Sequence, residues 1–230
     1  MSDSPRFETA HKRIRVYFAG HPVADTVNPV LVWENPYYPA YYLPAADVRT
    51  ELLRPTGHTR GDAELYTLRV GEREAVDAAA RFPRSPVEEL RELVRLDWAA
   101  MDAWFEEDEQ IYTHPRDPYT RLDILPSSRH VRVELAGVVI AESTRPHLLF
   151  ETGLQVRYYL PRVDVRLELL EPSGTVTHCP YKGQAEYWSV RLGETLHEDI
   201  MWSYPTPLPE SMRIAGLMGI YDERVDLHVG

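Results

Sequence analysis

The chain has 230 residues, 43% of them hydrophobic, which is enough to bury a sizeable core. Its formal net charge of −11 argues against nucleic acid as a partner, because no basic stripe is present to release counterions from phosphates. No run approaches the roughly 18 apolar residues of a membrane span, and one cysteine builds neither a disulfide nor a multi-thiolate zinc site, so we expect a cytoplasmic protein with no membrane partner, metal or cofactor.

The first predicted strand follows a polar stretch, residues 1–12, that we expect to be disordered. From Ile14 to Phe18, apolar and polar side chains alternate, which is the pattern of a half-buried strand. The chain then turns into a second strand at residues 23–26. We expect Asn28-Pro29 to close the hairpin that follows.

Two further strands are predicted in the first half of the chain, at residues 47–53 and 66–70. Between them, Arg54-Pro55-Thr56-Gly57 has proline at the second and glycine at the fourth position, as in a type I turn. The same arrangement recurs later as Glu171-Pro172-Ser173-Gly174. Short strands joined by such turns indicate antiparallel sheets.

Residues 86–111 support two interpretations. Apolar side chains fall near helical spacing, and Ser85-Pro86 is a good helix start. However, the corresponding part of the second half, residues 212–221, contains Gly216 and Gly219, which disfavour a helix. We therefore predict a strand at residues 93–96, followed by a short helical turn capped by Asp97.

An acidic cluster and a proline-rich link separate the two halves. Residues 106–109 are all acidic, which is most simply a solvated edge that prevents strand addition. In an alternative interpretation they dock a basic partner, and the protein is an interaction module. Residues 113–129 follow, and their prolines argue against regular structure.

Most of the chain consists of an internal sequence repeat in two copies. Residues 15–59 align without a gap on residues 132–176 at an offset of 117, and 20 of the 45 pairs are identical. Residues 66–71 then align on residues 188–193 at an offset of 122. The difference is a five-residue insertion in the second copy that contains Cys179-Pro180-Tyr181-Lys182-Gly183.

The duplication sets the expected domain organisation. We predict a disordered N-terminus (residues 1–12), a first repeat (13–112), a linker (113–129) and a second repeat (130–230). The fold is expected to be mainly β, with little helix and with the repeats packed about a pseudo-two-fold axis, in a monomer or a homodimer.

Several motifs of the second copy resemble one bacterial family. They are Tyr158-Tyr159-Leu160-Pro161, Asp164-Val165-Arg166 and Cys179-Pro180-Tyr181-Lys182-Gly183, followed by Ala185, Tyr187 and Trp188. With the linker motif that runs from His114 to Tyr119, they resemble tandem members of the family called domain of unknown function 427, and the resemblance covers nearly the whole chain.

The resemblance implies a β-tent fold, in which two antiparallel sheets meet at an angle, similar to methionine sulfoxide reductase B and the ligand-binding domain of cereblon. It also implies a pocket, but no established activity. The Cys-x-x-Cys zinc knuckles of those relatives are missing here. A nucleotidyltransferase label sometimes attached to the family finds no support, because the chain has no glycine-rich phosphate loop and no clear metal-binding aspartate pair.

The inserted turn is the strongest candidate for chemistry. Lys182 follows Cys179 by three residues, and an ammonium group near a thiol favours the thiolate. His178 would point to the opposite face of a strand, so a Cys-His pair would need another histidine, such as His114. Alternatively, Cys179 is a small buried hydrophobic residue, and Tyr181-Lys182-Gly183 forms a turn with no functional role.

The carboxylates and paired tyrosines are the next candidates. Glu151 lies beside Phe150 at a predicted strand end, where it could be an acid or a base or could pair with an arginine. Asp164 follows a proline-containing turn, where capping of backbone amides is the stronger interpretation. Tyr158 and Tyr159 put one ring on each face of a strand, for core packing or for ligand contact.

Aromatic residues concentrate in the second copy and could enclose a flat or cyclic ligand, form core, or line the seam between the copies. The leading hypothesis is therefore a small-molecule-binding protein, with a metabolic enzyme that uses Cys179, Lys182 or a carboxylate–tyrosine pair as the alternative. The candidate catalytic residues are Cys179, Lys182 and Glu151. The candidate ligand-binding residues are Tyr158, Tyr159, Asp164, Tyr181, Tyr187, Trp188, Trp202, Tyr204, His114 and Arg116.

Overall fold

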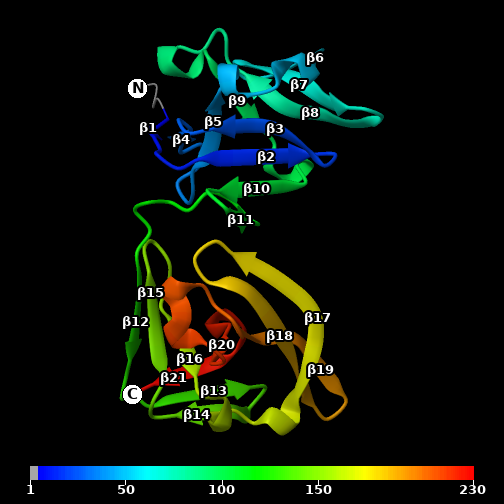
Figure 1. The fold of residues 1–230 in the computed structure, drawn as a ribbon. Coiled ribbons are helices and arrows are strands. Elements are labelled where there is room, and N and C mark those ends of the chain that lie inside the picture. The colour runs from blue at the N-terminus through cyan, green and yellow to red at the C-terminus, as the bar shows by residue number, and fades with distance from the viewer. Residues whose placement is uncertain (1–4) are drawn as a thin grey trace. The chain divides into compact units, whose positions relative to one another are not determined.

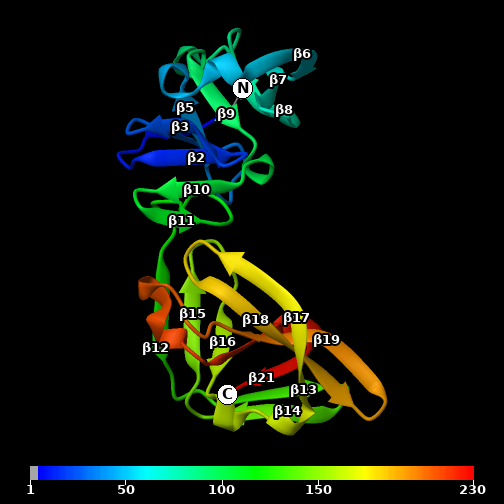
Figure 2. The same ribbon diagram turned by 45° about the vertical axis from the view of Figure 1, so that its right-hand side comes forward.

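A computed structural model describes residues 5–230 and divides the chain into two compact units (Figures 1 and 2). Unit 1 ends at Asp117 and unit 2 begins at Pro118, a boundary that falls inside the predicted linker. Each unit consists of one large and one small antiparallel sheet. The fold is therefore mainly β, as the sequence predicts.

Unit 1 contains a seven-stranded and a four-stranded sheet. In spatial order, the large sheet is β1 (Phe7–Thr9), β4 (Val30–Val32), β5 (Ala40–Pro44), β9 (Leu93–Leu96), β8 (Arg73–Arg81), β7 (Ala63–Val70) and β6 (Leu53–Arg60). The small sheet is β11 (Glu109–Ile111), β10 (Ala103–Glu106), β2 (Ile14–Phe18) and β3 (His21–Thr26).

Unit 2 repeats this topology with one strand fewer in its small sheet. Its large sheet is β12 (Leu122–Pro126), β15 (His147–Glu151), β16 (Arg157–Leu160), β20 (Met218–Ile220), β19 (Thr195–Ser203), β18 (Gly183–Leu192) and β17 (Leu170–Cys179). Its small sheet is β14 (Val138–Ser143), β13 (Val131–Leu135) and β21 (Asp226–Val229).

Helical structure in residues 5–230 is limited to short 3₁₀ turns between strands. They are η1 (Ala45–Asp47), η2 (Thr50–Leu52), η3 (Glu88–Leu90), η4 (Trp98–Ala100), η5 (Arg162–Asp164), η6 (Leu167–Leu169), η7 (Pro209–Ile214) and η8 (Asp222–Arg224). No helix in this part of the chain is long and apolar enough to cross a membrane.

The structural repeat begins earlier than the sequence repeat. Phe7 pairs with Val32 in β1–β4, and Ile124 pairs with Leu149 in β12–β15, so the two edge strands occupy equivalent positions at the same offset of 117. The predicted disorder of residues 1–12 therefore does not extend over β1, whereas residues 1–4 lie outside the described part. The predicted linker likewise contains β12. Such short strands are held mainly by backbone hydrogen bonds, which leave little periodicity in the sequence.

Three predicted turns are wrong. Both proline-containing turns lie inside long strands, where the register shifts between Pro55 and Thr59 in β6 and between Pro172 and Val176 in β17. The extra residues are accommodated as irregularities within the strands, which continue on both sides of them. Asn28-Pro29 closes no hairpin, because β3 belongs to the small sheet and β4 to the large one.

The ambiguous segment adopts the predicted strand. β9 spans Leu93–Leu96, and the Asp97 carboxylate accepts a hydrogen bond of 3.0 Å from the Ala99 amide at the start of η4. The helix interpretation of residues 86–111 is wrong, because the apolar residues pack on both faces of a sheet.

The large sheet of each unit buries apolar side chains on both faces. In unit 2 the face toward the small sheet packs Val133, Leu160 and Met218 into the main core. The other face carries a second cluster that includes Tyr159 and Trp202. Because neighbouring residues of a strand point to opposite faces, Tyr158 and Tyr159 belong to different cores.

Candidate functional site

The inserted turn between β17 and β18 is fastened by the segment that leads into η7. The Leu208 amide donates to the Lys182 carbonyl at 3.2 Å, and Ser211 Oγ donates to the Tyr181 carbonyl at 3.0 Å. Gly183 has a φ of +93°, which side chains rarely adopt, so glycine allows the chain to enter β18 here. The turn thus has a fixed shape.

Lys182 and Glu151 form a buried ion pair. Lys182 Nζ lies 2.5 Å from Glu151 Oε2, and only 11% and 9% of the two side chains are exposed. Removal of either partner would leave an uncompensated charge in a place that water hardly reaches. Of the two sequence interpretations of Glu151, the structure supports an ion pair, although the partner is Lys182 and not an arginine.

An aromatic cluster lies next to the β17–β18 turn, on the face of the large sheet that points away from the small sheet. We call it the Tyr204 cluster. Its members, buried or partly buried, are Leu122, Ile124, Leu149, Tyr159, Cys179, Ala185, Tyr187, Trp202, Tyr204, Ile214, Leu217 and Tyr221. Trp202 meets Tyr159 edge to face, with ring centres 6.0 Å apart, and its Nε1 donates to the Tyr159 hydroxyl at 3.1 Å. This pair forms a rigid floor.

The Tyr204 hydroxyl is the unusual group of this cluster. Tyr204 is only 6% exposed, yet among the described residues its hydroxyl makes no hydrogen bond. Burial raises the pKa of Tyr204, and the phenol of Tyr159 and the thiol of Cys179 add to this effect. The hydroxyl is not among the enclosed atoms that lack a partner, so it is accessible and can bond to another molecule.

A second pair of hydroxyls closes one side of the cluster. The Tyr187 hydroxyl shares a hydrogen bond of 2.9 Å with Thr177 Oγ1 and a longer one of 3.4 Å with the Tyr221 hydroxyl. Burial, followed by the contact with Tyr187, raises the pKa of Tyr221 to about 12. The Tyr221 phenol therefore stays protonated at neutral pH and is available as a hydrogen-bond donor.

Cys179 ends β17 and is half-buried at the margin of the Tyr204 cluster. The proposed activation of its thiol depends on the ammonium group of Lys182. That ammonium is already neutralised by Glu151, so it contributes little to stabilising a thiolate. In this geometry Cys179 packs at the edge of the ring cluster, and the cation proposed to activate it is already paired.

Some predicted ligand-binding residues lie away from this cluster. Tyr158 and Trp188 pack into the main core on the opposite face of the sheet. Asp164 accepts hydrogen bonds from Ser143 Oγ at 2.7 Å and from Arg145, which lower the pKa of its carboxyl group. Its counterpart Asp47 accepts one from Thr26 Oγ1, so this aspartate has a structural role in both units.

The two predicted residues of the linker belong to unit 1. His114 stacks on Tyr38 with ring centres 4.2 Å apart, and its Nδ1 lies 2.7 Å from the Pro115 carbonyl. Arg116 forms an ion pair of 2.6 Å with Glu109. Neither residue is part of the Tyr204 cluster.

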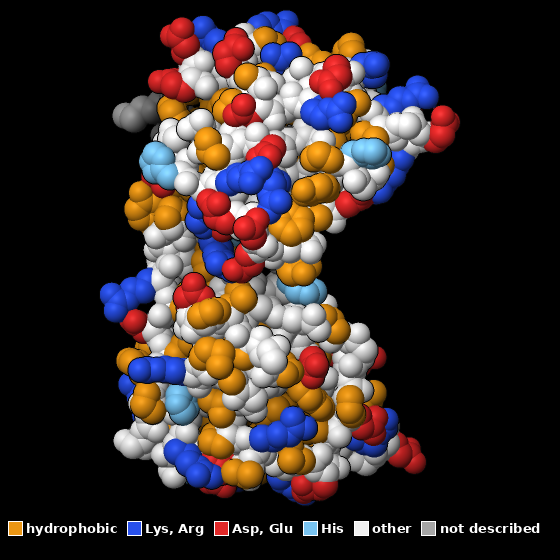
Figure 3. All heavy atoms as spheres, viewed as in Figure 1, with side chains coloured by type: hydrophobic (Ala, Val, Ile, Leu, Met, Phe, Trp, Pro, Cys, Tyr) orange, Lys and Arg blue, Asp and Glu red, His pale blue; other side chains and the backbone are white. Residues whose placement is uncertain are grey.

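The acidic cluster is not a solvated edge throughout. Glu106 is only 6% exposed, and its carboxylate accepts hydrogen bonds from the Tyr41 hydroxyl at 2.8 Å and from Lys12 Nζ at 2.6 Å. Asp108 is paired with Arg15 at 2.8 Å. Figure 3 shows acidic and basic side chains side by side on this face of unit 1. Because the cluster is compensated internally, it offers little free charge to a basic partner.

Three members of the site were not predicted from the sequence: Thr177, Ile214 and Tyr221. The available signal was a comparison of the copies after the insertion, because register places Leu65 and Phe82 of unit 1 where unit 2 has Tyr187 and Tyr204. The second copy has thus gained hydroxyl groups at positions that are apolar in the first.

Among residues 5–230, no group of three or more His, Cys, Asp or Glu side chains is placed to hold a metal ion. Comparison with curated proteins gives no match. The family model described as domain of unknown function 427 (DUF427) matches twice, over residues 6–107 and residues 123–230. These two matches cover both copies of the repeat and nearly all of the chain, which therefore belongs to the DUF427 family as a tandem member.

Proposed function

We propose that this chain is a small-molecule-binding protein and that its ligand site is the Tyr204 cluster of unit 2. The observation that carries the proposal is the Tyr204 hydroxyl: the side chain is 6% exposed, yet the hydroxyl makes no hydrogen bond to the described residues and is not enclosed by them. A ligand that supplies an acceptor there would form a hydrogen bond with this hydroxyl. Cys179 and Tyr221 are only partly buried, so the cluster reaches the surface at this edge.

The ligand is expected to be small and flat, with at least one polar acceptor. Trp202, Tyr159 and Ile214 are buried and form the apolar base of the cluster, whereas the phenols of Tyr187, Tyr204 and Tyr221 can donate hydrogen bonds. Sites of this kind bind mainly through apolar contact and use a few polar groups for orientation. The Lys182–Glu151 pair is neutral as a whole, so a strongly charged ligand is not favoured.

The first test is to identify small molecules that purify with the protein. Native protein would be denatured, and the released compounds would be measured by liquid chromatography and mass spectrometry, for the wild type and for Tyr204→Phe. This variant restores the residue type that unit 1 has at Phe82, so the fold should tolerate it. We expect the released compound to be depleted about tenfold or more, the effect of losing one buried hydrogen bond to a ligand.

Tyr158→Phe is the matched control, because it removes the same hydroxyl from the other face of the same sheet. It should retain the compound at the wild-type level. If the wild type releases no compound beyond what Tyr204→Phe releases, the proposal is wrong.

Binding without covalent chemistry is favoured over the enzyme hypothesis because Lys182 is held by Glu151. Intact-protein mass spectrometry after iodoacetamide treatment at pH 7 tests this point. We expect Cys179 to react no faster than a model thiol with an ordinary pKa of about 8.5. Alkylation that is much faster would revive the covalent mechanism and contradict this part of the proposal.

A further inference from the structure

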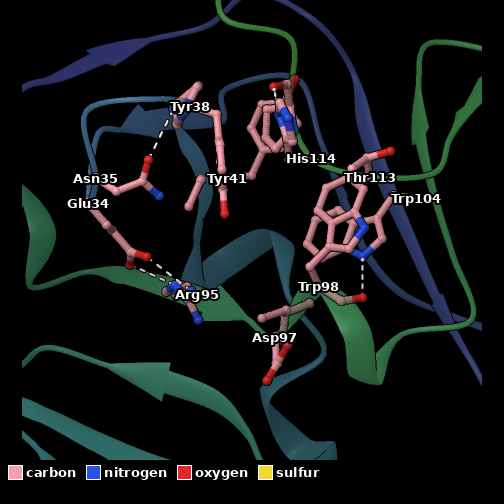
Figure 4. Close-up of a pocket in the computed structure, with 14 residues that line it drawn as sticks. Glu34, Asn35, Tyr38, Tyr41, Arg95, Asp97, Trp98, Trp104, Thr113 and His114 are labelled. Carbon is pink, nitrogen blue, oxygen red and sulfur yellow. Dashed lines mark hydrogen bonds and ion pairs between the residues drawn. The ribbon is translucent and has the colours of Figure 1, made fainter. Parts of the chain in front are cut away.

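Unit 1 contains a cavity of about 200 Å³ that has no part in the proposed site of unit 2. It lies among the ends of β4 and β5, the turn η4 and the segment around His114 (Figure 4). Because ligand pockets commonly have volumes of about 300 to 1,000 Å³, a cavity of this size suits a small ligand.

Aromatic rings form most of its walls. Trp98 and Trp104 stack with ring centres 4.6 Å apart and planes within 5°, and Tyr41 lies beside Trp104 at 6.5 Å. Tyr38 and His114, stacked at 4.2 Å, form a separate wall. Figure 4 shows the two groups of rings on different sides of the same hollow. Ring faces carry partial negative charge and attract cations.

The charged groups of the cavity reinforce this preference. Glu34 accepts hydrogen bonds from Tyr42 at 2.6 Å and from Arg95 at 3.0 Å, so its charge is compensated by Arg95. Asp97, the other acidic residue of the lining, is exposed, and its carboxylate accepts a hydrogen bond from the Ala99 amide, which carries no charge. Burial lowers the pKa of His114, so its imidazole is neutral at pH 7. The charge that remains uncompensated in the lining is the negative charge of Asp97.

Arg95 holds the acidic side chain of Glu34 at the cavity wall. Arg95 Nε lies 2.7 Å from Glu34 Oε1, and Arg95 Nη2 donates to Glu34 Oε2 at 3.0 Å. Arg95 Nε is fully buried, so it is not accessible to a ligand. The cavity therefore combines cation-attracting walls with an ion pair that is neutral as a whole.

We propose that this cavity is a second ligand site, specific for a small organic cation such as an alkylated ammonium compound. The ammonium group would lie against the rings of Trp98 and Tyr38. The second repeat lacks this cage, since register places Asp222 and Leu227 of unit 2 where unit 1 has Trp98 and Trp104. The site is thus a property of the first repeat.

The test compares two probes of the same shape with the full-length protein. Choline carries a quaternary ammonium group, and 3,3-dimethylbutan-1-ol replaces its charged nitrogen with carbon. Isothermal titration at pH 7.5, with sodium chloride balancing the choline chloride, should show that choline binds at least about tenfold more tightly. That ratio corresponds to contributions of about 0.5 to 2 kcal/mol from each desolvated cation–ring contact.

Neighbouring tyrosines supply a matched pair of variants. Tyr38 lines the cavity at 40% exposure, whereas Tyr37 is 73% exposed and does not line it, so neither substitution by alanine should unfold the protein. Tyr38→Ala should weaken choline binding about fivefold or more, and Tyr37→Ala should leave it unchanged.

Three results would overturn the proposal: no detectable choline binding, equal affinity for the two probes, or equal loss from Tyr38→Ala and Tyr37→Ala. The result is independent of the site in unit 2. Tyr204→Phe should not change choline affinity, so failure of one site can be distinguished from failure of the other.

Discussion

Gly219 lies directly opposite Trp202 in the β19–β20 pair, and a Cβ atom at residue 219 would come within 2.5 Å of Trp202 Cε2. Unit 1 has Ala80 opposite Arg95 at the equivalent place. Each unit thus pairs one small residue with one large one, but the large residue is on the other strand. As a result, unit 2 has the indole of Trp202 at this place, bonded to Tyr159, and unit 1 has Arg95, bonded to Glu34.

Gly219→Ala should destabilise the protein, because the methyl group must displace the Trp202 ring and strain its hydrogen bond to Tyr159. Overpacking of this kind costs about 1 to 3 kcal/mol. The free energy of unfolding in urea measures the effect. Gly174→Ala is the control, since nothing lies within 4 Å of its Cβ position, and it should change stability by less than about 1 kcal/mol. Equal effects of both substitutions would argue against the predicted clash.

Lys182→Met should destabilise unit 2 by about 3 to 5 kcal/mol, because it leaves the buried Glu151 carboxylate without a counter-charge. The double variant Lys182→Met/Glu151→Leu should recover most of this loss, since neither charge remains. Arg49→Met breaks an exposed ion pair with Glu51 and should cost less than about 1 kcal/mol. A double variant no more stable than Lys182→Met would show that the two residues are not coupled.

Glu106→Gln should destabilise unit 1 by about 1 to 3 kcal/mol, because the buried carboxylate accepts hydrogen bonds from both Tyr41 and Lys12. Asp108→Asn is the matched control in the same acidic run. Asp108 is 97% exposed, so its pair with Arg15 should contribute less than about 1 kcal/mol. Urea unfolding followed by tryptophan fluorescence provides the measurement. Equal costs for the two substitutions would restore the interpretation of a solvated edge.

His114 should make the protein less stable in mild acid. Burial lowers its pKa in the folded state below the usual 6.5, so the unfolded chain binds the proton first as the pH falls. The free energy of unfolding therefore decreases as pH drops from about 6.5 toward the folded-state pKa, and His114 has no such effect at higher pH.

His114→Phe should keep the ring that stacks on Tyr38 but remove the titration. We expect the loss of stability between pH 7 and pH 5.5, measured by urea unfolding, to be smaller in this variant than in the wild type. His147, whose pKa is also lowered by burial, remains in both proteins and contributes equally. An unchanged pH dependence would mean that His114 is accessible to protons in the folded state.

The sequence located the candidate site of unit 2 only in part. The insertion at Cys179-Pro180-Tyr181-Lys182-Gly183 is visible as a gap between two copies, and it leads to Lys182 and Tyr204. Tyr221 and Thr177 are far apart in the sequence, and they meet Tyr187 only because β17, β18 and β20 belong to one sheet. No spacing along the chain records such contacts.

By itself, the sequence determined the duplication, the β architecture and the strand at Leu93–Leu96, because repeats, alternation and glycine placement are properties of the chain in order. Tertiary structure decided which charges are buried and which polar groups find partners. Glu106 and Asp108 are both acidic residues of one run, yet one is enclosed by Tyr41 and Lys12 and the other faces water. Burial depends on which strands lie beside a residue in space, and that is fixed only when the sheets assemble.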